Sequence, residues 1–174
     1  MSPTSLMFGL CAGYMNGVAN ASFASLSPVF GEEDIGALMA LTSLVAAASS
    51  LLGGAAARRT GEGPILGLGA SAFAAMHVLL WVWRPSPDNG YWGWGLLGLY
   101  ALQGLGRSVF EGTNRAVFAD SFPSAQAAGA FANCMMQSSF AFFACFLLQG
   151  CLSAENLERV VGCIVLLLAL MTIP

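Results

Sequence analysis

The stretch QGLGRSVFEGTNRAVFADSFP, from Gln103 to Pro123, decides the fold prediction because it places charged residues inside a long apolar segment. Arg107, Glu111 and Asn114 follow one another at helical spacing, so they share one face of a helix, with Arg115 beside them. A charged side chain costs roughly 2.5–3.5 kcal/mol at the centre of a membrane helix. If this stretch crosses a membrane, its polar face is expected to point inward, toward a partner helix or a hydrated cavity.

The composition predicts a membrane protein. Of the 174 residues, 57% are hydrophobic and 9% are charged, whereas about 25% are charged in an ordinary soluble domain. So few charged side chains cannot cover a soluble surface. The net charge of −3 provides no basic patch, so nucleic acid is not an expected partner.

The hydrophobic pattern predicts an all-α, polytopic membrane helix bundle. A membrane-spanning helix needs about 20 mostly apolar residues, and the expected spans lie near residues 6–26, 35–57, 64–83, 91–119, 127–150 and 157–173. The connections are short and rich in turn-forming residues, so consecutive helices should be antiparallel neighbours. We predict a single six-helix domain over residues 1–174. The short last span predicts a fragment, or half of a twelve-helix protein.

Arginine positions predict the orientation. Cytoplasmic loops carry an excess of basic residues. Three arginines fall on one side (Arg58, Arg59 and Arg115) and two on the other (Arg84 and Arg159). The first side is therefore predicted to be cytoplasmic, and six spans place both termini there. The expected location is a membrane, with a multi-pass topology.

Polar residues within the spans are candidates for a substrate pathway. They are Asn16, Asn20, Arg107, Glu111, Asn114, Asn133 and Gln137. Two interpretations stay open for the asparagines of the first span: hydrogen bonds between helices, or the wall of a polar cavity. Glu111 lies four residues from both Arg107 and Arg115, so these charges can form a mutually neutralising ladder, line a ligand pathway, or do both.

The turn GGAAARRTGEGP resembles the inter-helix loop that marks the major facilitator superfamily of membrane transporters. Arg58 departs from that pattern, because it stands where the superfamily usually has an acidic residue. LQGLG followed by an apolar run and ADSFP resembles the fourth helix of a half in that superfamily. The loop residues that carry the resemblance are Gly54, Arg58, Arg59, Thr60 and Gly61.

A narrower resemblance points to the uncoordinated-93-like branch of that superfamily. The sequence is similar to that branch in its loop, in the run from His77 to Pro85, in the polar fourth span with its Phe122-Pro123 turn, and in Ala130–Asn133. The resemblance implies the second six-helix half, built as a 3+3 inverted repeat whose first and fourth helices line a central pathway. Arg107 and Glu111 depart from what that branch leads us to expect.

Two functions follow from this resemblance as expectations. The first is transmembrane transport of a small solute, with Arg107 contacting an anion and Glu111 acting as countercharge or proton carrier. The alternative is a non-transporting regulator or escort of ion channels or receptors. The expected partners are the lipid bilayer and a second six-helix half, a homodimer mate, or a membrane channel or receptor. No enzyme, metal or cofactor is expected, because the sequence shows no metal-ligand cluster and no nucleotide-binding loop.

Overall fold

The structure is a computed structural model that describes residues 3–172, and within that range it is helical, with six rods joined by short turns. Two rods contain a π-helical segment. The elements in chain order are α1 (Pro3–Tyr14), η1 (Met15–Ala24), η2 (Glu32–Asp34), α2 (Ile35–Thr60), α3 (Glu62–Val82), η3 (Pro87–Gly95), α4 (Leu96–Val109), η4 (Phe110–Asn114), α5 (Arg115–Ser121), α6 (Ser124–Cys151) and α7 (Ala154–Thr172).

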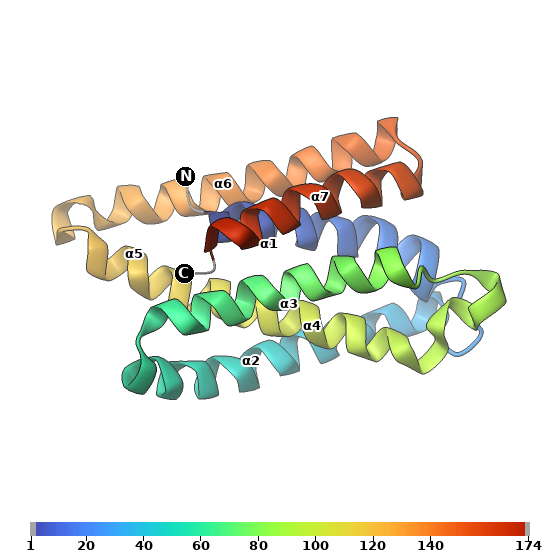
Figure 1. The fold of residues 1–174 in the computed structure, drawn as a ribbon, viewed down its shortest axis with the longest axis horizontal. Coiled ribbons are helices and arrows are strands. Elements are labelled where there is room, and N and C mark those ends of the chain that lie inside the picture. Colours follow the sequence, from blue (N-terminus) through green and yellow to red (C-terminus); the bar gives the residue numbers. More distant parts are fainter. Residues whose placement is uncertain (1–2, 173–174) are drawn as a thin grey trace.

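The rods lie roughly side by side along the long axis of the molecule (Figure 1). α1 packs against α6 and α7, α4 packs against α2 and α3, and α3 joins the two groups through α7. The α2–α3 and α5–α6 turns lie at one end of the bundle, and the other three connections lie at the opposite end (Figure 1). This is the antiparallel order that the short connections predicted.

Turn residues fix where the rods begin and end. Gly61 separates α2 from α3 with a φ of 84°, a conformation that glycine adopts without a Cβ clash. The fourth rod begins at Leu96, and not near Tyr91 as expected. Tyr91 and Trp92 have positive φ angles within the turn η3, so their aromatic rings belong to the connection and not to the helix.

Three helices are long and apolar enough to cross a membrane: Glu32–Thr60, Glu62–Val82 and Ser124–Cys151. Large apolar side chains are exposed on these helices; Leu51, Val82 and Phe140 are 80%, 80% and 64% exposed. A soluble monomer rarely exposes extended apolar patches, so these surfaces contact lipid. The other rods contain π turns, or charged residues such as Glu155 and Glu158, within their apolar stretches.

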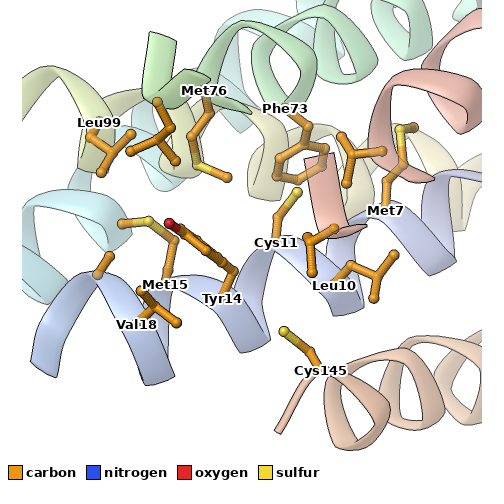
Figure 2. Packing of buried hydrophobic residues seen from close by; sticks show 14 of the residues in the cluster. Met7, Leu10, Cys11, Tyr14, Met15, Val18, Phe73, Met76, Leu99 and Cys145 are labelled. Atoms are coloured by element: carbon orange, nitrogen blue, oxygen red, sulfur yellow. The ribbon is translucent and has the colours of Figure 1, made fainter. Parts of the chain in front are cut away.

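The core is built around the first rod. Met7, Cys11 and Tyr14 of α1 are fully buried, and their side chains lie among residues from α3, α4 and α6 (Figure 2). On another face of the rod, Gly9, Gly13 and Gly17 meet α6. A Cβ added at Gly13 would lie 2.8 Å from the Cβ of Cys145, closer than carbon atoms normally pack.

We expect Gly13→Ala to destabilise the bundle, because α1 and α6 must separate to admit the methyl group. Overpacking of this kind costs about 1–3 kcal/mol. Gly67→Ala in α3 is the matched control, because nothing lies within 4 Å of its added Cβ. Thermal unfolding in detergent should show a lower midpoint for Gly13→Ala alone. Equal midpoints for the two variants would show that α1 and α6 do not pack this closely.

Candidate functional site: a polar cavity beside Arg107

Both rods that carry most of the predicted site residues contain a π-helical segment. Met15–Ala24 includes Asn16 and Asn20, and Phe110–Asn114 includes Glu111 and Asn114. π turns form hydrogen bonds from residue i to i+5, are rare, and occur frequently at functional sites. They also rotate the following side chains relative to an α-helix, so the faces inferred from α-helical spacing change across them.

A cavity of about 250 Å³ lies where four rods meet, and we call it the polar cavity. Helices α1, α2, α4 and α6, together with η1, supply its wall. The lining residues are Phe8, Ala12, Met15, Asn16, Met39, Thr42, Gln103, Arg107 and Phe142. Two residues predicted from the sequence, Asn16 and Arg107, are thereby brought to one site from different rods.

Arg107 and Glu111 form the predicted ion pair. The Nε atom of Arg107 donates to Oε1 of Glu111 at 3.0 Å, and both side chains are 35% exposed. Arg107 lines the polar cavity, whereas Glu111 is not among the lining residues. The contact to Glu111 is made through Nε, and the guanidinium also carries Nη1 and Nη2, which suit bidentate recognition of a carboxylate.

The ladder stops at this pair, because Arg115 lies elsewhere. Its guanidinium lies 5.7 Å from the centre of the Phe110 ring, and Nη2 lies 3.9 Å from Sδ of Met135. The π segment between Glu111 and Arg115 accounts for this, because a turn closed over five residues rotates Arg115 off the face of Glu111. Phe110 in turn stacks on Phe8 of the cavity wall at 4.2 Å between ring centres.

Gln103 is a cavity residue that the sequence analysis did not select. It lies one helical turn before Arg107 on α4, is 5% exposed, and lines the polar cavity. Among residues 3–172, its Oε1 atom has no hydrogen-bond partner. An unsatisfied buried acceptor costs about 1–3 kcal/mol. Its spacing could have identified it, because a residue four positions before Arg107 lies on the same face of the helix.

The asparagines of the first rod have different roles. Asn16 is exposed, and its Nδ2 donates to the carbonyl oxygen of Ala12 at 2.8 Å. Asn20 accepts a hydrogen bond from the hydroxyl of Tyr100 on α4. Asn16 therefore lines the cavity, and Asn20 forms an interhelical hydrogen bond.

Asn114, Asn133 and Gln137 lie outside the polar cavity. Asn114 is buried, accepting from the Thr4 hydroxyl at 2.6 Å and donating to Ser5 at 3.5 Å, so it ties the fourth rod to the first. Asn133 and Gln137 line a second groove, of about 540 Å³, between α5 and α6. The π-helical segment η4 rotates the Asn114 side chain away from the face of Arg107, as it does for Arg115.

The predicted loop residues surround the α2–α3 turn. Arg58 and Arg59 occupy the last turn of α2, where cations are favourable beside the helix C-terminus. Thr60 ends that helix, and its hydroxyl donates to the carbonyl oxygen of Ala56. Gly54 and Arg58 also line a groove of about 520 Å³ between α2, α3 and α4.

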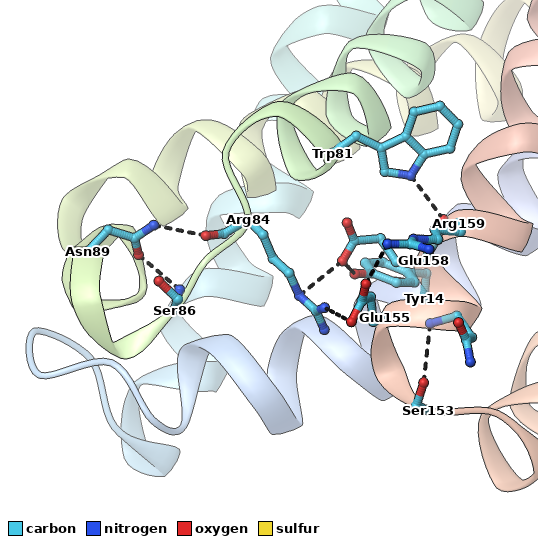
Figure 3. Close-up of polar contacts among 10 residues, drawn as sticks. Tyr14, Trp81, Arg84, Ser86, Asn89, Ser153, Glu155, Glu158 and Arg159 are labelled. Carbon is cyan, nitrogen blue, oxygen red and sulfur yellow. Dashed lines mark hydrogen bonds and ion pairs between the residues drawn. The ribbon is translucent and has the colours of Figure 1, made fainter.

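A charged cluster ties α7 to α1 and to the end of α3. The Glu158 side chain is 4% exposed, lies 3.5 Å from Nε of Arg84, and accepts from the Tyr14 hydroxyl at 3.2 Å (Figure 3). Arg84 also lies 3.7 Å from Glu155, and the Trp81 indole donates to the carbonyl oxygen of Glu158 at 3.4 Å. No local sequence pattern predicts this cluster, because its members come from three separate parts of the chain.

Long apolar helices with exposed apolar faces define a helical membrane protein. Residues 6–174 match the Major Facilitator Superfamily, so the chain belongs to that superfamily. No curated protein and no solved structure matches the chain. The predicted superfamily is thus confirmed, whereas the uncoordinated-93-like branch stays a prediction.

Proposed function

We propose that this chain is one six-helix half of a facilitator that carries a small solute through the polar cavity. In this proposal all six rods cross the membrane, both termini are cytoplasmic, and the first and fourth rods line the pathway. The observation that carries the proposal is the position of Arg107. Arg107 lines a cavity where four rods of the bundle meet, and an ionisable side chain inside a membrane bundle is costly and usually marks a substrate or ion pathway.

The packing of the rods supports the proposed 3+3 repeat. The first three rods are α1–η1, α2 and α3, and the last three are α4–η4–α5, α6 and α7. If each of the first three rods is exchanged with its counterpart among the last three, the main contacts between rods correspond to one another. The contact of α1 with α6 then corresponds to that of α4 with α2, and the contact of α1 with α7 to that of α4 with α3. Each of the two equivalent rods also contains a π segment. Inverted repeats of this kind form substrate sites at their interface.

We further propose that the chain belongs to the uncoordinated-93-like branch, and that a second six-helix unit covers the polar cavity in the working protein. Asn16 and the partly exposed Arg107 leave polar groups accessible on this face. Alternating access in the superfamily uses two such halves around a central site. The second unit is either another part of the same protein or a homodimer mate.

Arg107→Ala is expected to lower uptake of an anionic solute into proteoliposomes by about 10- to 100-fold, because a hydrogen bond to a charged group contributes about 1.5–3 kcal/mol. The assay should use the complete coding sequence and a panel of labelled small organic anions. Arg159→Ala is the matched control, because Arg159 is 68% exposed and lies outside the cavity.

Unchanged uptake by Arg107→Ala would remove Arg107 from the pathway. If the wild-type protein carries no member of the panel, the transport proposal fails for anions. A regulator or escort of other membrane proteins would then be the better hypothesis, and purification from membranes should recover a defined channel or receptor.

A further inference from the structure

We infer that the groove between α2, α3 and α4 binds a phospholipid of net charge −1, with its phosphate on Arg58 and one acyl chain inside the groove. We call this groove the lateral groove. Its volume is about 520 Å³, and its wall includes Gly53, Ile65, Leu105 and Val109. The inference does not depend on the proposed transport, because the lateral groove and the polar cavity share no lining residue.

The wall of the lateral groove suits a hydrocarbon chain. Small and aliphatic residues form most of it, and α2 contributes Gly53, Gly54 and Ala57, so a chain can lie close to the helix backbone. The Ser50 hydroxyl on this wall donates to the carbonyl oxygen of Ser108 at 3.4 Å, so it already has a partner within the fold. Apolar chains gain free energy by leaving water for such a surface.

The length of the lateral groove corresponds to one leaflet of a bilayer. Arg58 lies in the last turn of α2, beside the α2–α3 turn at one end of the bundle (Figure 1). From Arg58 the groove extends along α2 as far as Ser49, which is about 13 Å at 1.5 Å per residue. Half of the hydrocarbon core of a bilayer is about 15 Å thick. A lipid with its phosphate beside Arg58 can therefore place one acyl chain along the whole groove.

The charge at the mouth of the groove suits one phosphate group. Arg58 is exposed and lines the groove, and among residues 3–172 it forms no ion pair. Arg59 adds a second cation beside it, whereas Glu62, which also lines the groove, adds one carboxylate. One positive charge is thus in excess. A guanidinium binds phosphate through paired N–H donors, and basic pockets between membrane helices bind lipid head groups.

The lateral groove opens away from the polar cavity. Leu105 lines the groove, whereas Gln103 and Arg107 line the cavity. A step of two residues along a helix turns about 200° around its axis, so the two sites lie on opposite faces of α4. Leu51 and Leu52 of α2, beside the groove, are 80% and 73% exposed. A six-helix unit over the polar cavity would therefore leave the lateral groove open to lipid.

Phosphatidylglycerol binding to the purified, delipidated complete protein in detergent tests this inference. Diacylglycerol with the same chains lacks the phosphate, and glycerophosphoglycerol lacks the chains. Thermal stabilisation should be measured against the amount of each probe, and native mass spectrometry should count the lipids that stay bound. We expect phosphatidylglycerol to stabilise at concentrations at least about tenfold lower than diacylglycerol, because only its phosphate pairs with Arg58. Glycerophosphoglycerol should not stabilise the protein.

Variants assign the two contacts. Arg58→Gln should remove the preference for phosphatidylglycerol over diacylglycerol, whereas the control Arg159→Gln, at an exposed arginine outside the groove, should keep it. Gly54→Phe should weaken binding of both lipids, because its ring occupies the groove. Gly67→Phe is the matched control. Nothing lies within 4 Å of an added Cβ at either glycine, and only Gly54 lines the groove.

Four results would overturn the inference. The first is no stabilisation by phosphatidylglycerol, and the second is equal affinity for phosphatidylglycerol and diacylglycerol. The third is a preference for the phosphate that survives Arg58→Gln. The fourth is binding of glycerophosphoglycerol as tight as that of the lipid, which would assign the site to a soluble phosphodiester. Loss of lipid retention in native mass spectra of Gly54→Phe, with retention kept in Gly67→Phe, would support the inference. A smaller assembly for Gly54→Phe with no lipid bound to the unchanged protein would show that a protein surface covers the groove.

Discussion

Exchanging the two charges of the Arg107–Glu111 pair is expected to preserve the fold and to reduce uptake of organic anions by about 100-fold or more. The double variant Arg107→Glu with Glu111→Arg keeps an ion pair at the same helical spacing. It moves the cation out of the polar cavity, because Arg107 lines that cavity and Glu111 does not. Uptake into proteoliposomes and thermal stability in detergent measure the two effects separately.

This exchange separates a structural pair from a ligand site. A glutamate four residues before a basic residue stabilises a helix more than the reverse order, so the exchanged pair should suit the helix at least as well as the natural Arg-then-Glu order. Helix stability alone therefore gives no reason for the natural order. Full uptake by the exchanged variant would show that the pair serves only to neutralise charge inside the bundle.

Replacing Arg84 with methionine is expected to destabilise the bundle by about 3 kcal/mol, because it leaves the buried carboxylate of Glu158 without its countercharge. This value is at the lower end of the usual range for a broken buried pair, since Arg84 is 35% exposed. Thermal unfolding in detergent should show a large decrease in the midpoint.

Two further variants give this prediction its controls. Arg84→Met combined with Glu158→Gln should recover much of the loss, because a neutral amide no longer requires a cation and can still pair with Tyr14. Arg159→Met should cost less than about 1 kcal/mol, because the Arg159–Glu155 pair is exposed. Equal losses for Arg84→Met and Arg159→Met would contradict the burial of Glu158.

The sequence was sufficient to predict the helical rods and the superfamily, because apolar length and turn residues are local signals. The fourth rod was the exception. Trp92 has the aromatic character of a membrane helix, yet the prolines and glycines of its segment place it in a turn with positive φ. The predicted partnership of Arg107 with Glu111 also holds, since both partners lie on one helix.

The other contacts of the site depend on how the rods pack and on the π segments, which local sequence patterns do not reveal. Asn114 shares a face with Arg107 in an ideal α-helix, but the π segment rotates it into the contact with Thr4 and Ser5. Gln103 was overlooked because an uncharged residue in an apolar run gives a weak signal. The enclosure of Glu158 by Tyr14 and Arg84 could not be inferred, because no local spacing links these residues.

The two π segments also determine where the length of the rods can change. A residue added to an α-helix advances every later side chain by about 100° around the axis, which would rotate one half of a rod out of its packing. Within Met15–Ala24 or Phe110–Asn114, the wider turn already accommodates such an excess. Single-residue insertions and deletions within the rods of related chains should therefore concentrate at these two segments. A change of one residue there leaves the side chains on either side of the segment facing their present neighbours.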